Sequence, residues 1–301
     1  MKFKAFLNRD GGTLRTMDID AYAARVKAAF EAKGHEIDVA VVEAAEMEKA
    51  LRHAATEVEL DGLIAGGGDG TISTAAGIAW KSGLALGVIP AGTMNLFARS
   101  LGLPLDVDAV LPVLAQGFVR PVDIATANGR PFVHQFSAGL HARMVALRNR
   151  MDYASRLGKI RASIRAAFGV ILNPPAFEVE FRAAGSHGKR RVSAISVSNN
   201  AFGTNPLMVP DDVSGGHLGF YLADALAPSG VARLAVDILR GRLKDNEAVN
   251  FFEARDVRLH FPRMAKLGHG LLDGELIPLA RDVDLKIHAG ELKVLVPSDA
   301  G

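Results

Sequence analysis

The sequence predicts an α/β protein of two domains. An N-terminal α/β nucleotide-binding domain with a parallel sheet precedes a C-terminal antiparallel β-sandwich-like domain. Up to about residue 119, apolar strand-like runs alternate with helical patterns, which is typical of parallel pairing. Beyond that point, short alternating segments punctuated by turns take over. The length of 301 residues exceeds what one core usually holds and favours two domains.

The first domain is expected to alternate buried strands with helices. Asp18 or Asp20 can cap a helix that carries Tyr22 on its apolar face and closes near Gly34. The remaining elements are strands over 2–7, 39–42, 60–65 and 84–89, and helices over about 43–59 and 73–81.

The second domain is expected to be rich in strands, with turns at Asn128-Gly129, Ala184-Gly185 and Ala289-Gly290. Two helical stretches, about 141–172 and 229–240, interrupt the pattern. Its expected strands cover 122–127, 131–137, 176–183, 191–197, 219–223, 257–261, 283–287 and 292–296.

Composition excludes several classes of protein. The 35 basic and 33 acidic residues leave a net charge of +2, so net charge gives no support for nucleic-acid binding. Cysteine is absent, which excludes disulfides and thiolate metal sites, and the nine histidines lack zinc-type spacing. The chain has neither an apolar run of the roughly 18 residues a spanning helix needs nor a signal-peptide pattern. A cytoplasmic protein is therefore expected.

The first informative motif is Gly66-Gly67-Gly68-Asp69-Gly70-Thr71, between a predicted strand and a predicted helix. Free backbone N–H groups at a helix N-terminus bind anions, and glycine permits close approach and positive φ. Asp69 would repel a phosphate unless a cation intervened, which suggests a Mg²⁺ bridge. The motif is neither a Walker A loop nor a dinucleotide fingerprint. The alternative is a tight strand-to-helix turn.

A second motif, running from Pro90 to Arg99, follows the next predicted strand as Pro-Ala-Gly-Thr-Met-Asn-Leu-Phe-Ala-Arg. In a parallel sheet, both motifs fall at the carboxyl ends of strands on one edge, where ligands bind. Thr93 can offer a hydroxyl and Asn95 an amide to a phosphate. Taken alone, the second motif could simply cap the following helix.

Together with two further segments, these motifs resemble the diacylglycerol-kinase-type lipid kinases, a family that includes bacterial diacylglycerol kinases and eukaryotic sphingosine and ceramide kinases. Asn8 and Gly12 resemble the family's first-strand turn, although Arg9 replaces its proline. Leu272-Asp273-Gly274-Glu275 resembles the late segment that carries the catalytic aspartate. The order and approximate spacing of all four segments agree.

The resemblance implies transfer of the γ-phosphoryl group of ATP, with Mg²⁺, to the hydroxyl of a diacylglycerol-like or sphingoid-like lipid. It implies a first domain over 1–120 joined by a C-terminal strand over 288–301, and a lipid domain over 121–287. Asp273 would be the general base, and Glu275 would hold a metal-bound water or orient the site. By itself, Asp273-Gly274 also fits an ordinary hairpin turn. The implied nucleotide-binding residues are Asn8, Gly12, Gly66, Gly67, Gly68, Asp69, Gly70, Thr71, Ser73, Gly92, Thr93 and Asn95, with Asp69 also the metal ligand.

The chain departs from the family at two further positions. Leu96 stands where bacterial diacylglycerol kinases typically carry an aspartate, which weakens the case for diacylglycerol itself. Gly215 occupies an aspartate position near which some members bind a structural Mg²⁺, so that ion is not predicted. Two alternatives stay open: a kinase of NAD or another small molecule, suggested by the phrase over 216–220, and a catalytically silent lipid-binding regulatory protein.

A basic stretch over 143–165 contains seven cations and one acid, Asp152, with apolar residues at helical spacings. Such a helix is typical of membrane-surface elements. A peripheral position at the inner membrane face is therefore expected, with a solvated helix face as the alternative. No feature of the sequence specifies an oligomeric state.

Overall fold

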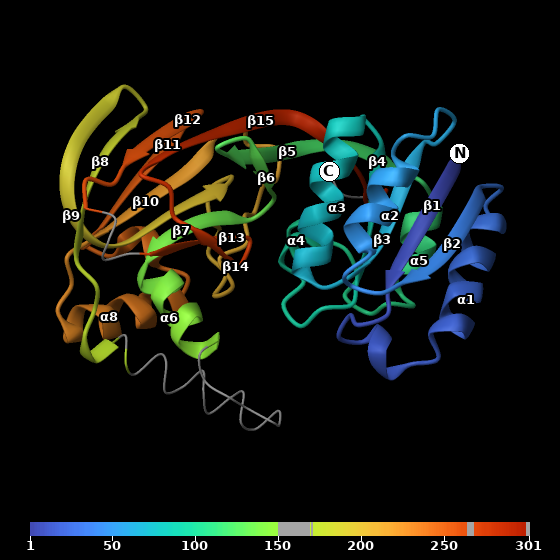
Figure 1. Cartoon of the computed structure of the whole chain (residues 1–301), viewed down its shortest axis with the longest axis horizontal. Helices are drawn as coiled ribbons and strands as arrows, with labels where there is room; N and C mark the ends of the chain where they lie inside the picture. Colours follow the sequence, from blue (N-terminus) through green and yellow to red (C-terminus); the bar gives the residue numbers. More distant parts are fainter. Residues whose placement is uncertain (150–168, 170, 264–267, 299–301) are drawn as a thin grey trace.

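The structure, a computed structural model, describes residues 1–149, 169, 171–263 and 268–298. Two lobes lie side by side, joined by the antiparallel strands β5 (Val119–Ala127) and β15 (Asp282–Leu295) (Figure 1). Each lobe has its own hydrophobic core. No helix among the described residues is long and apolar enough to cross a membrane.

The first lobe is a parallel sheet covered by helices. Its strands lie in the order β4-β3-β1-β2, and the end of β15 pairs in parallel with β4. Helix α1 packs with α5, and α2 with α3. The elements are β1 (Lys2–Asn8), α1 (Ile19–Glu31), β2 (Glu36–Val42), α2 (Met47–Ala54), β3 (Gly62–Gly67), α3 (Asp69–Ser82), β4 (Ala85–Pro90), α4 (Leu96–Ser100) and α5 (Val110–Ala115).

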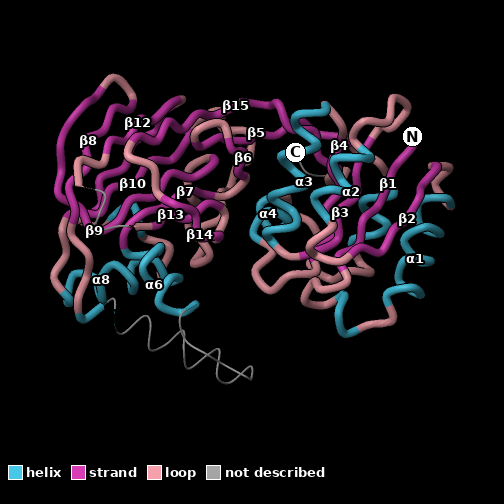
Figure 2. The backbone as a smooth tube through the Cα atoms, in the orientation of Figure 1, coloured by secondary structure: helices cyan, strands magenta, loops and turns pink. Residues whose placement is uncertain are grey.

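The second lobe is built from antiparallel strands with helices at one end, as Figure 2 shows. Strand β9 pairs with β7, β8 and β10, and β12 joins β8 to β15. The elements are β6 (Arg130–Phe132), β7 (Gln135–Gly139), α6 (Leu140–Asn149), β8 (Phe177–Ala183), β9 (Ser186–Asn199), β10 (Leu218–Asp224), α8 (Pro228–Leu239), β11 (Val249–Ala254), β12 (Asp256–His260), β13 (His269–Leu272) and β14 (Glu275–Pro278).

Local signals account for several boundaries. The Asp18 carboxylate accepts the Ala21 N–H and caps α1, as one of the two expected caps. The turns at Asn128-Gly129 and Ala184-Gly185 have positive φ at both positions, the geometry that two-residue hairpins favour. The predicted fold class, parallel in the first lobe and antiparallel in the second, is confirmed.

Some predicted boundaries were wrong. The strand expected over 131–137 is split into β6 and β7, because the backbone between them bends to donate hydrogen bonds to Asp273. The strands expected over 283–287 and 292–296 form the single strand β15, in which Ala289-Gly290 lies within a bulge. The helix expected over 43–59 covers only Met47–Ala54. Strands β11, β13 and β14 and helices α4 and α5 were not predicted.

Candidate active site

Three strand ends meet at one edge of the parallel sheet. Gly12 follows β1 and Ala91 follows β4. Their backbones approach so closely that a Cβ atom added to Gly12 would lie 2.8 Å from the carbonyl oxygen of Ala91. A Cβ on Gly92 would lie 2.7 Å from Cα of Gly68, at the end of β3. Only glycine permits such approach of one backbone to another. The two glycine motifs and the first-strand turn therefore form one surface, as their place after parallel strands predicted.

Helix α3 begins at Asp69, four residues earlier than predicted, so most of the first motif is its N-cap and first turn. Gly68 is the extended N-cap, with φ −84°. None of the four glycines in the motif has positive φ, so the expectation of left-handed backbone there was wrong. Close packing instead accounts for Gly66 and Gly67, since an added Cβ would lie 2.8 Å from the Leu7 side chain and 2.6 Å from the Thr71 side chain, respectively. Free N–H groups at this helix start suit an anion.

The Asp69 carboxylate joins the two motifs. Its Oδ2 accepts the Asn95 N–H at 3.1 Å, and its Oδ1 accepts the Leu96 N–H at 2.6 Å. Leu96 therefore contributes to the site through its backbone. Each carboxylate oxygen keeps a further lone pair, so Asp69 can still meet a cation. Among the described residues, no group of three or more histidines, aspartates or glutamates could hold a metal alone.

The Asn95 side chain holds its own loop in shape. Its carboxamide oxygen accepts the Gly92 N–H at 2.8 Å, and its amide donates to the carbonyl oxygens of Pro90 and Gly92. Asn95 has a left-handed φ of 50°. The amide is thus engaged within the loop rather than free for a phosphate, which corrects the predicted direct contact. Thr93 is exposed, and its hydroxyl bonds no described residue, so it remains available.

The first-strand turn is tied to α3. Asn8 is buried at the end of β1, and its amide donates to the Thr71 hydroxyl at 3.0 Å. Its carboxamide oxygen accepts the Asp10 N–H. Asn8 and Thr71 therefore hold the first glycine motif against the end of β1. The surface that remains for a ligand is largely backbone.

Asp273 lies on a hairpin turn and also reaches the first lobe. Asp273-Gly274 joins β13 to β14 with φ of 47° and 84°, so the alternative interpretation as a hairpin is correct for the backbone. The buried carboxylate accepts the Ser73 hydroxyl of α3 at 2.6 Å. It also accepts the N–H groups of Val133, His134 and Gln135 at 2.9 to 3.0 Å. Sequence reasoning gave no signal for these three donors.

Burial raises the pKa of Asp273, and the hydrogen bonds from Ser73 and the three backbone groups partly oppose that rise. A carboxylate with a raised pKa is the better proton acceptor. The Asp273 carboxylate accepts four hydrogen bonds, two on each oxygen. Ser73 is the only side-chain donor among them, so it is the one that an incoming hydroxyl could replace.

Glu275 lies beside the start of α3. A Cβ on Gly70 would lie 2.9 Å from Glu275 Oε1, and the other oxygen pairs with Arg130 at 3.0 Å. Both charged groups are about half exposed, so the pair itself adds little stability. Its position near the phosphate motifs fits a role in orienting the site. Arg130 was not predicted.

A nearly apolar cavity of about 330 Å³ opens in the second lobe between the sheet and the helices α6 and α8. No charged residue lines it among the described residues. Its polar lining consists of Gln135, Ser137, His141, Ser196 and Tyr221. Gln135 lines this cavity, and its backbone N–H donates to the Asp273 carboxylate. A single residue therefore separates the cavity from that carboxylate.

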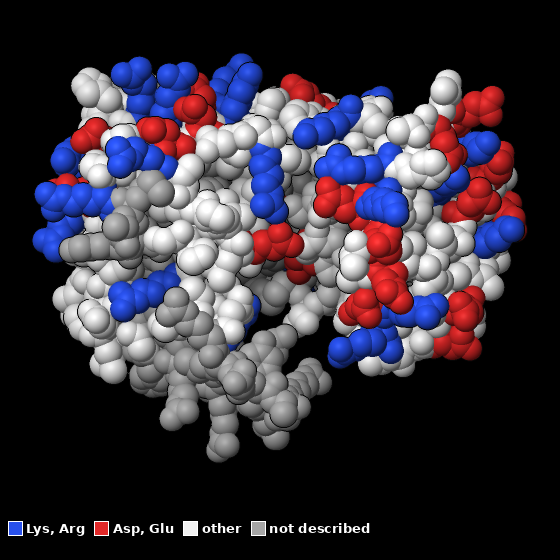
Figure 3. Space-filling view, viewed as in Figure 1, with Lys and Arg blue, Asp and Glu red and all other residues white. Residues whose placement is uncertain are grey.

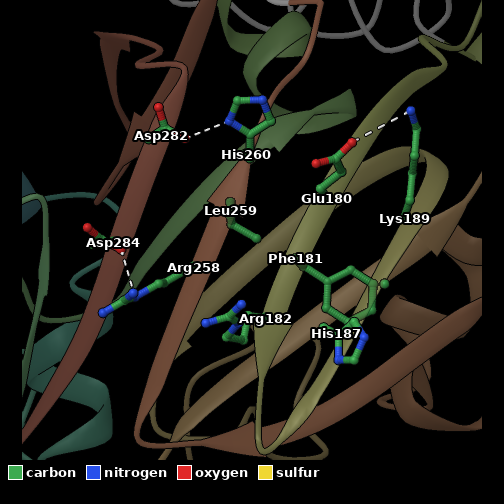
Figure 4. A pocket seen from close by; sticks show the side chains of 11 residues that line it. Glu180, Phe181, Arg182, His187, Lys189, Arg258, Leu259, His260, Asp282 and Asp284 are labelled. Atoms are coloured by element: carbon green, nitrogen blue, oxygen red, sulfur yellow. Dashed lines mark hydrogen bonds and ion pairs between the residues drawn. The ribbon is translucent and has the colours of Figure 1, made fainter.

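A larger groove, about 700 Å³, lies on the outer face of β8, β9, β12 and β15 (Figure 4). Its charges are mostly paired across strands, with Arg258 on Asp284, Lys189 on Glu180 and His260 on Asp282. The groove is charge-balanced and lacks every residue of the glycine motifs. The candidate active site is therefore the region between the lobes, where the surface in Figure 3 is notched.

Comparison with known proteins finds similarity to diacylglycerol kinases. Residues 2–127 match the family model described as "Diacylglycerol kinase catalytic domain". The chain is 26% identical over 284 residues to a diacylglycerol kinase of Bacillus subtilis (strain 168), covering 87% of this chain and 89% of that protein. The chain is therefore similar to diacylglycerol kinases, over residues 2–127 in the family model and over most of its length in this relative.

Other relatives agree over shorter stretches. A "probable lipid kinase YegS-like" protein of Klebsiella pneumoniae (strain 342) is 38% identical over 93 residues, covering 30% of this chain and 31% of that protein. A solved diacylglycerol kinase from Bacillus anthracis str. Sterne superposes with a TM-score of 0.72 at 16% identity, covering 100% of this chain and 98% of that one. That likeness concerns the fold.

The basic stretch over 143–165 falls mostly outside the described residues. Arg143 and Arg148 lie in α6, whereas Arg150, Arg156, Lys159, Arg161 and Arg165 are not described. The predicted helix over 141–172 is accordingly described as α6 up to Asn149.

Proposed function

We propose that this chain is an ATP- and Mg²⁺-dependent lipid kinase that phosphorylates a hydroxyl of a diacylglycerol-like or sphingoid-like lipid. One observation carries the proposal. The Asp273 carboxylate bonds Ser73 on the helix that starts at the glycine motifs, and it also lies one residue from the end of an apolar cavity. The glycine motifs at the start of α3, the Asp273 carboxylate and an apolar cavity of about 330 Å³ thus adjoin, which supports the proposal. The similarity of residues 2–127 to the family model and of most of the chain to a diacylglycerol kinase supports the same class of reaction.

In this mechanism, the acceptor hydroxyl replaces Ser73 at Asp273. The acceptor oxygen forms a bond to the γ-phosphorus of ATP while the bond to the bridging oxygen breaks, which releases ADP. The hydroxyl proton passes to Asp273. The N–H groups of Val133, His134 and Gln135 hold the carboxylate in place throughout.

The residues present fit Mg²⁺ bound mainly by phosphates. Mg²⁺ usually takes one or two protein carboxylates and keeps several waters, and Asp69 offers one carboxylate at the start of α3. Bound there, the ion would neutralise charge on the transferring phosphates. The other contacts to the phosphates would come from the backbone N–H groups that follow β3 and β4 and from the Thr93 hydroxyl.

A γ-phosphate transfer screen tests the function across diacylglycerol, monoacylglycerol, phosphatidylglycerol, sphingosine, ceramide and NAD. We expect phosphorylation of at least one lipid that depends on ATP and Mg²⁺. Transfer to NAD alone would instead establish the small-molecule kinase. A folded chain that binds lipid but transfers phosphate to no acceptor would establish the silent regulatory protein.

The cavity is tested by a pair of tryptophan variants on α8. Ala232 and Ala235 are both exposed on this helix, but only Ala235 lines the cavity. Ala235→Trp should lower kcat/KM for a long-chain lipid about tenfold by filling acyl space, and ATP affinity should stay unchanged. Ala232→Trp is the matched control. Equal kcat/KM values for the two variants would show that the acyl chains do not bind in this cavity.

We also propose peripheral membrane contact through the basic stretch over 143–165. Each cation near an anionic surface contributes about 1 kcal/mol, screened by salt. Reversing Arg156, Lys159 and Arg161 to glutamate should weaken sedimentation with anionic liposomes at low salt. The control carries the same charge change on the outer groove, in Arg182→Glu, Lys189→Glu and Arg258→Glu. Equal weakening in both would show a net-charge effect alone.

A further inference from the structure

One face of helix α3 forms a joint between the two lobes, on the side of the first lobe that faces the second (Figure 1). The residues on this face are spaced three or four positions apart and are Gly70, Ser73, Gly77 and Trp80. Ser73 donates to the Asp273 carboxylate at 2.6 Å, and the backbone at Gly70 lies against the Glu275 side chain. The face therefore meets the second lobe along most of the helix.

Gly77 lies directly against β6 on this face. It is buried in the middle of α3, and a Cβ atom added to it would lie 2.5 Å from Cγ of Pro131. That distance is about 1 Å shorter than a favourable contact between two carbon atoms. The Pro131 ring is rigid, and its strand is held by pairing with β5. Because glycine is a poor residue for a helix interior, close approach rather than helix propensity accounts for Gly77.

The segment that Gly77 contacts also orients Asp273. Pro131 lies two residues before Val133, whose N–H donates to Oδ2 of Asp273 at 2.9 Å. The same oxygen accepts the Ser73 hydroxyl, one helical turn before Gly77 on α3. Since α3 begins at the first glycine motif, the spacing between α3 and β6 sets how far this carboxylate lies from the proposed phosphate site.

We propose that Gly77 is a positioning residue for phosphoryl transfer: it sets the spacing between α3 and β6 and thereby holds Asp273 beside the phosphates. The inference rests on the proposed function and assigns a role to a residue outside the reacting groups. A side chain at position 77 would push β6 away from α3 and draw the carboxylate away from Ser73. Misplacing a reacting group by about 1 Å can lower a rate on the order of 100-fold.

Steady-state kinetics with the lipid acceptor identified by the transfer screen test this role. Gly77→Ala should lower kcat, counted per ATP-binding site, about 10- to 100-fold with unchanged ATP affinity. Adding Pro131→Ala removes the obstructing Cγ and leaves Cβ, at 3.3 Å, so the double variant should recover most of the loss. Gly230→Ala in α8 is the matched control, because the atoms nearest to its added Cβ belong to the flexible Leu226 side chain. It should match the wild type.

A double-mutant cycle with Asp273→Asn separates positioning from general damage to the fold. Where Asp273 cannot accept a proton, its distance from the phosphates matters little, so Gly77→Ala should lower kcat hardly any further. An equal fold-loss in both backgrounds would overturn the positioning role, and so would a normal kcat in Gly77→Ala. If Gly77→Ala alone does not fold, a double variant with Pro131→Ala that folds and stays impaired would also overturn it.

A second readout needs no turnover, because Trp80 is the only tryptophan in the chain. Its indole N–H donates to Glu291, in the bulge of β15, at 2.9 Å. Strand β6 pairs with β5 and β5 pairs with β15, so displacement of β6 should also loosen this contact. Gly77→Ala should therefore shift the Trp80 emission to the red and increase its quenching by acrylamide, and added Pro131→Ala should reverse both changes.

The emission of Gly230→Ala should equal that of the wild type. An unchanged spectrum in Gly77→Ala would overturn the spacing role. A wild-type chain that is inactive on every lipid, but whose variants show the red shift and its reversal, would contradict the proposed function alone.

Discussion

At the scale of single residues, Asp273 combines a structural role with the role of general base that we propose for it. Its backbone makes the β13–β14 turn, and its carboxylate anchors the bend between β6 and β7 while touching α3. Each carboxylate oxygen takes two donors, so the side chain is held in one orientation. In the proposed mechanism, the three backbone N–H groups keep this orientation, and only the bond from Ser73 breaks when the acceptor hydroxyl binds.

Asp273→Asn should lower kcat by about 10² to 10⁴, because the amide cannot take a proton. The amide nitrogen also cannot accept the backbone N–H groups, so the free energy of unfolding should fall by about 1 to 3 kcal/mol. ATP affinity should barely change. Isothermal titration, denaturant unfolding and initial rates measure the three quantities, with exposed Asp284→Asn as control. Normal turnover of a folded Asp273→Asn enzyme would refute the assignment.

At the scale of elements, the site depends on how helices begin after strands. α3 starts directly at the end of β3, and its first residue, Asp69, binds the start of α4. The two phosphate motifs are thereby locked together by one side chain. Asp69 therefore stabilises the loop through the N–H groups of Asn95 and Leu96, in addition to the role of metal ligand that we propose for it.

Asp69→Ala should reduce Mg²⁺-dependent turnover by orders of magnitude, because it removes the proposed metal ligand and frees the N–H groups of Asn95 and Leu96. Asp10 gives a matched control, since its carboxylate accepts one backbone N–H, from Ala44, at the same end of the sheet. Asp10→Ala should keep near-normal turnover. Rates measured over a Mg²⁺ titration, together with thermal melts, compare the two. Wild-type rates in folded Asp69→Ala would exclude the metal role.

At the scale of the whole molecule, the pairing of β5 with β15 brings the two lobes together and sets the site between them. The contact between Ser73 and Asp273 joins positions 200 residues apart. His134, which is buried, and His141, which is partly buried, lie on the second-lobe side of this junction, and desolvation lowers the pKa of each to about 4. They link the stability of the molecule to pH.

Between about pH 4 and 6.5, the unfolded chain binds more protons at these histidines than the folded chain, so their contribution to stability rises with pH and is lost on acidification. The raised pKa of Asp273 has the opposite effect. Above the ordinary pKa of an aspartate, the folded chain binds more protons at this carboxylate than the unfolded chain, so this contribution to stability falls as the pH rises. Comparing variants separates the two contributions. The midpoint of urea unfolding should rise from pH 4.5 to 6.5 less steeply in His141→Gln than in the wild type. Parallel profiles would contradict the lowered pKa of His141.

The sequence by itself determined the class of each lobe, the glycine motifs and the hairpin at Asp273. These depend on local periodicity, on residues that tolerate unusual backbone, and on the rule that parallel strands end at one edge. The extent of α3 and the roles of Asn95 and Asp69 within their loops needed the structure, because side-chain hydrogen bonds to nearby backbone do not follow from spacing.

Only the tertiary structure decided what surrounds Asp273. The donors at Val133, His134 and Gln135, the contact with Ser73, and the uncharged cavity come from segments far apart in the chain. Nothing in their local sequence marks them, since backbone N–H groups are common to nearly all residues and apolar side chains serve cores and cavities alike. The active site is thus encoded in part by motifs and in part by the strand pairing that joins the lobes.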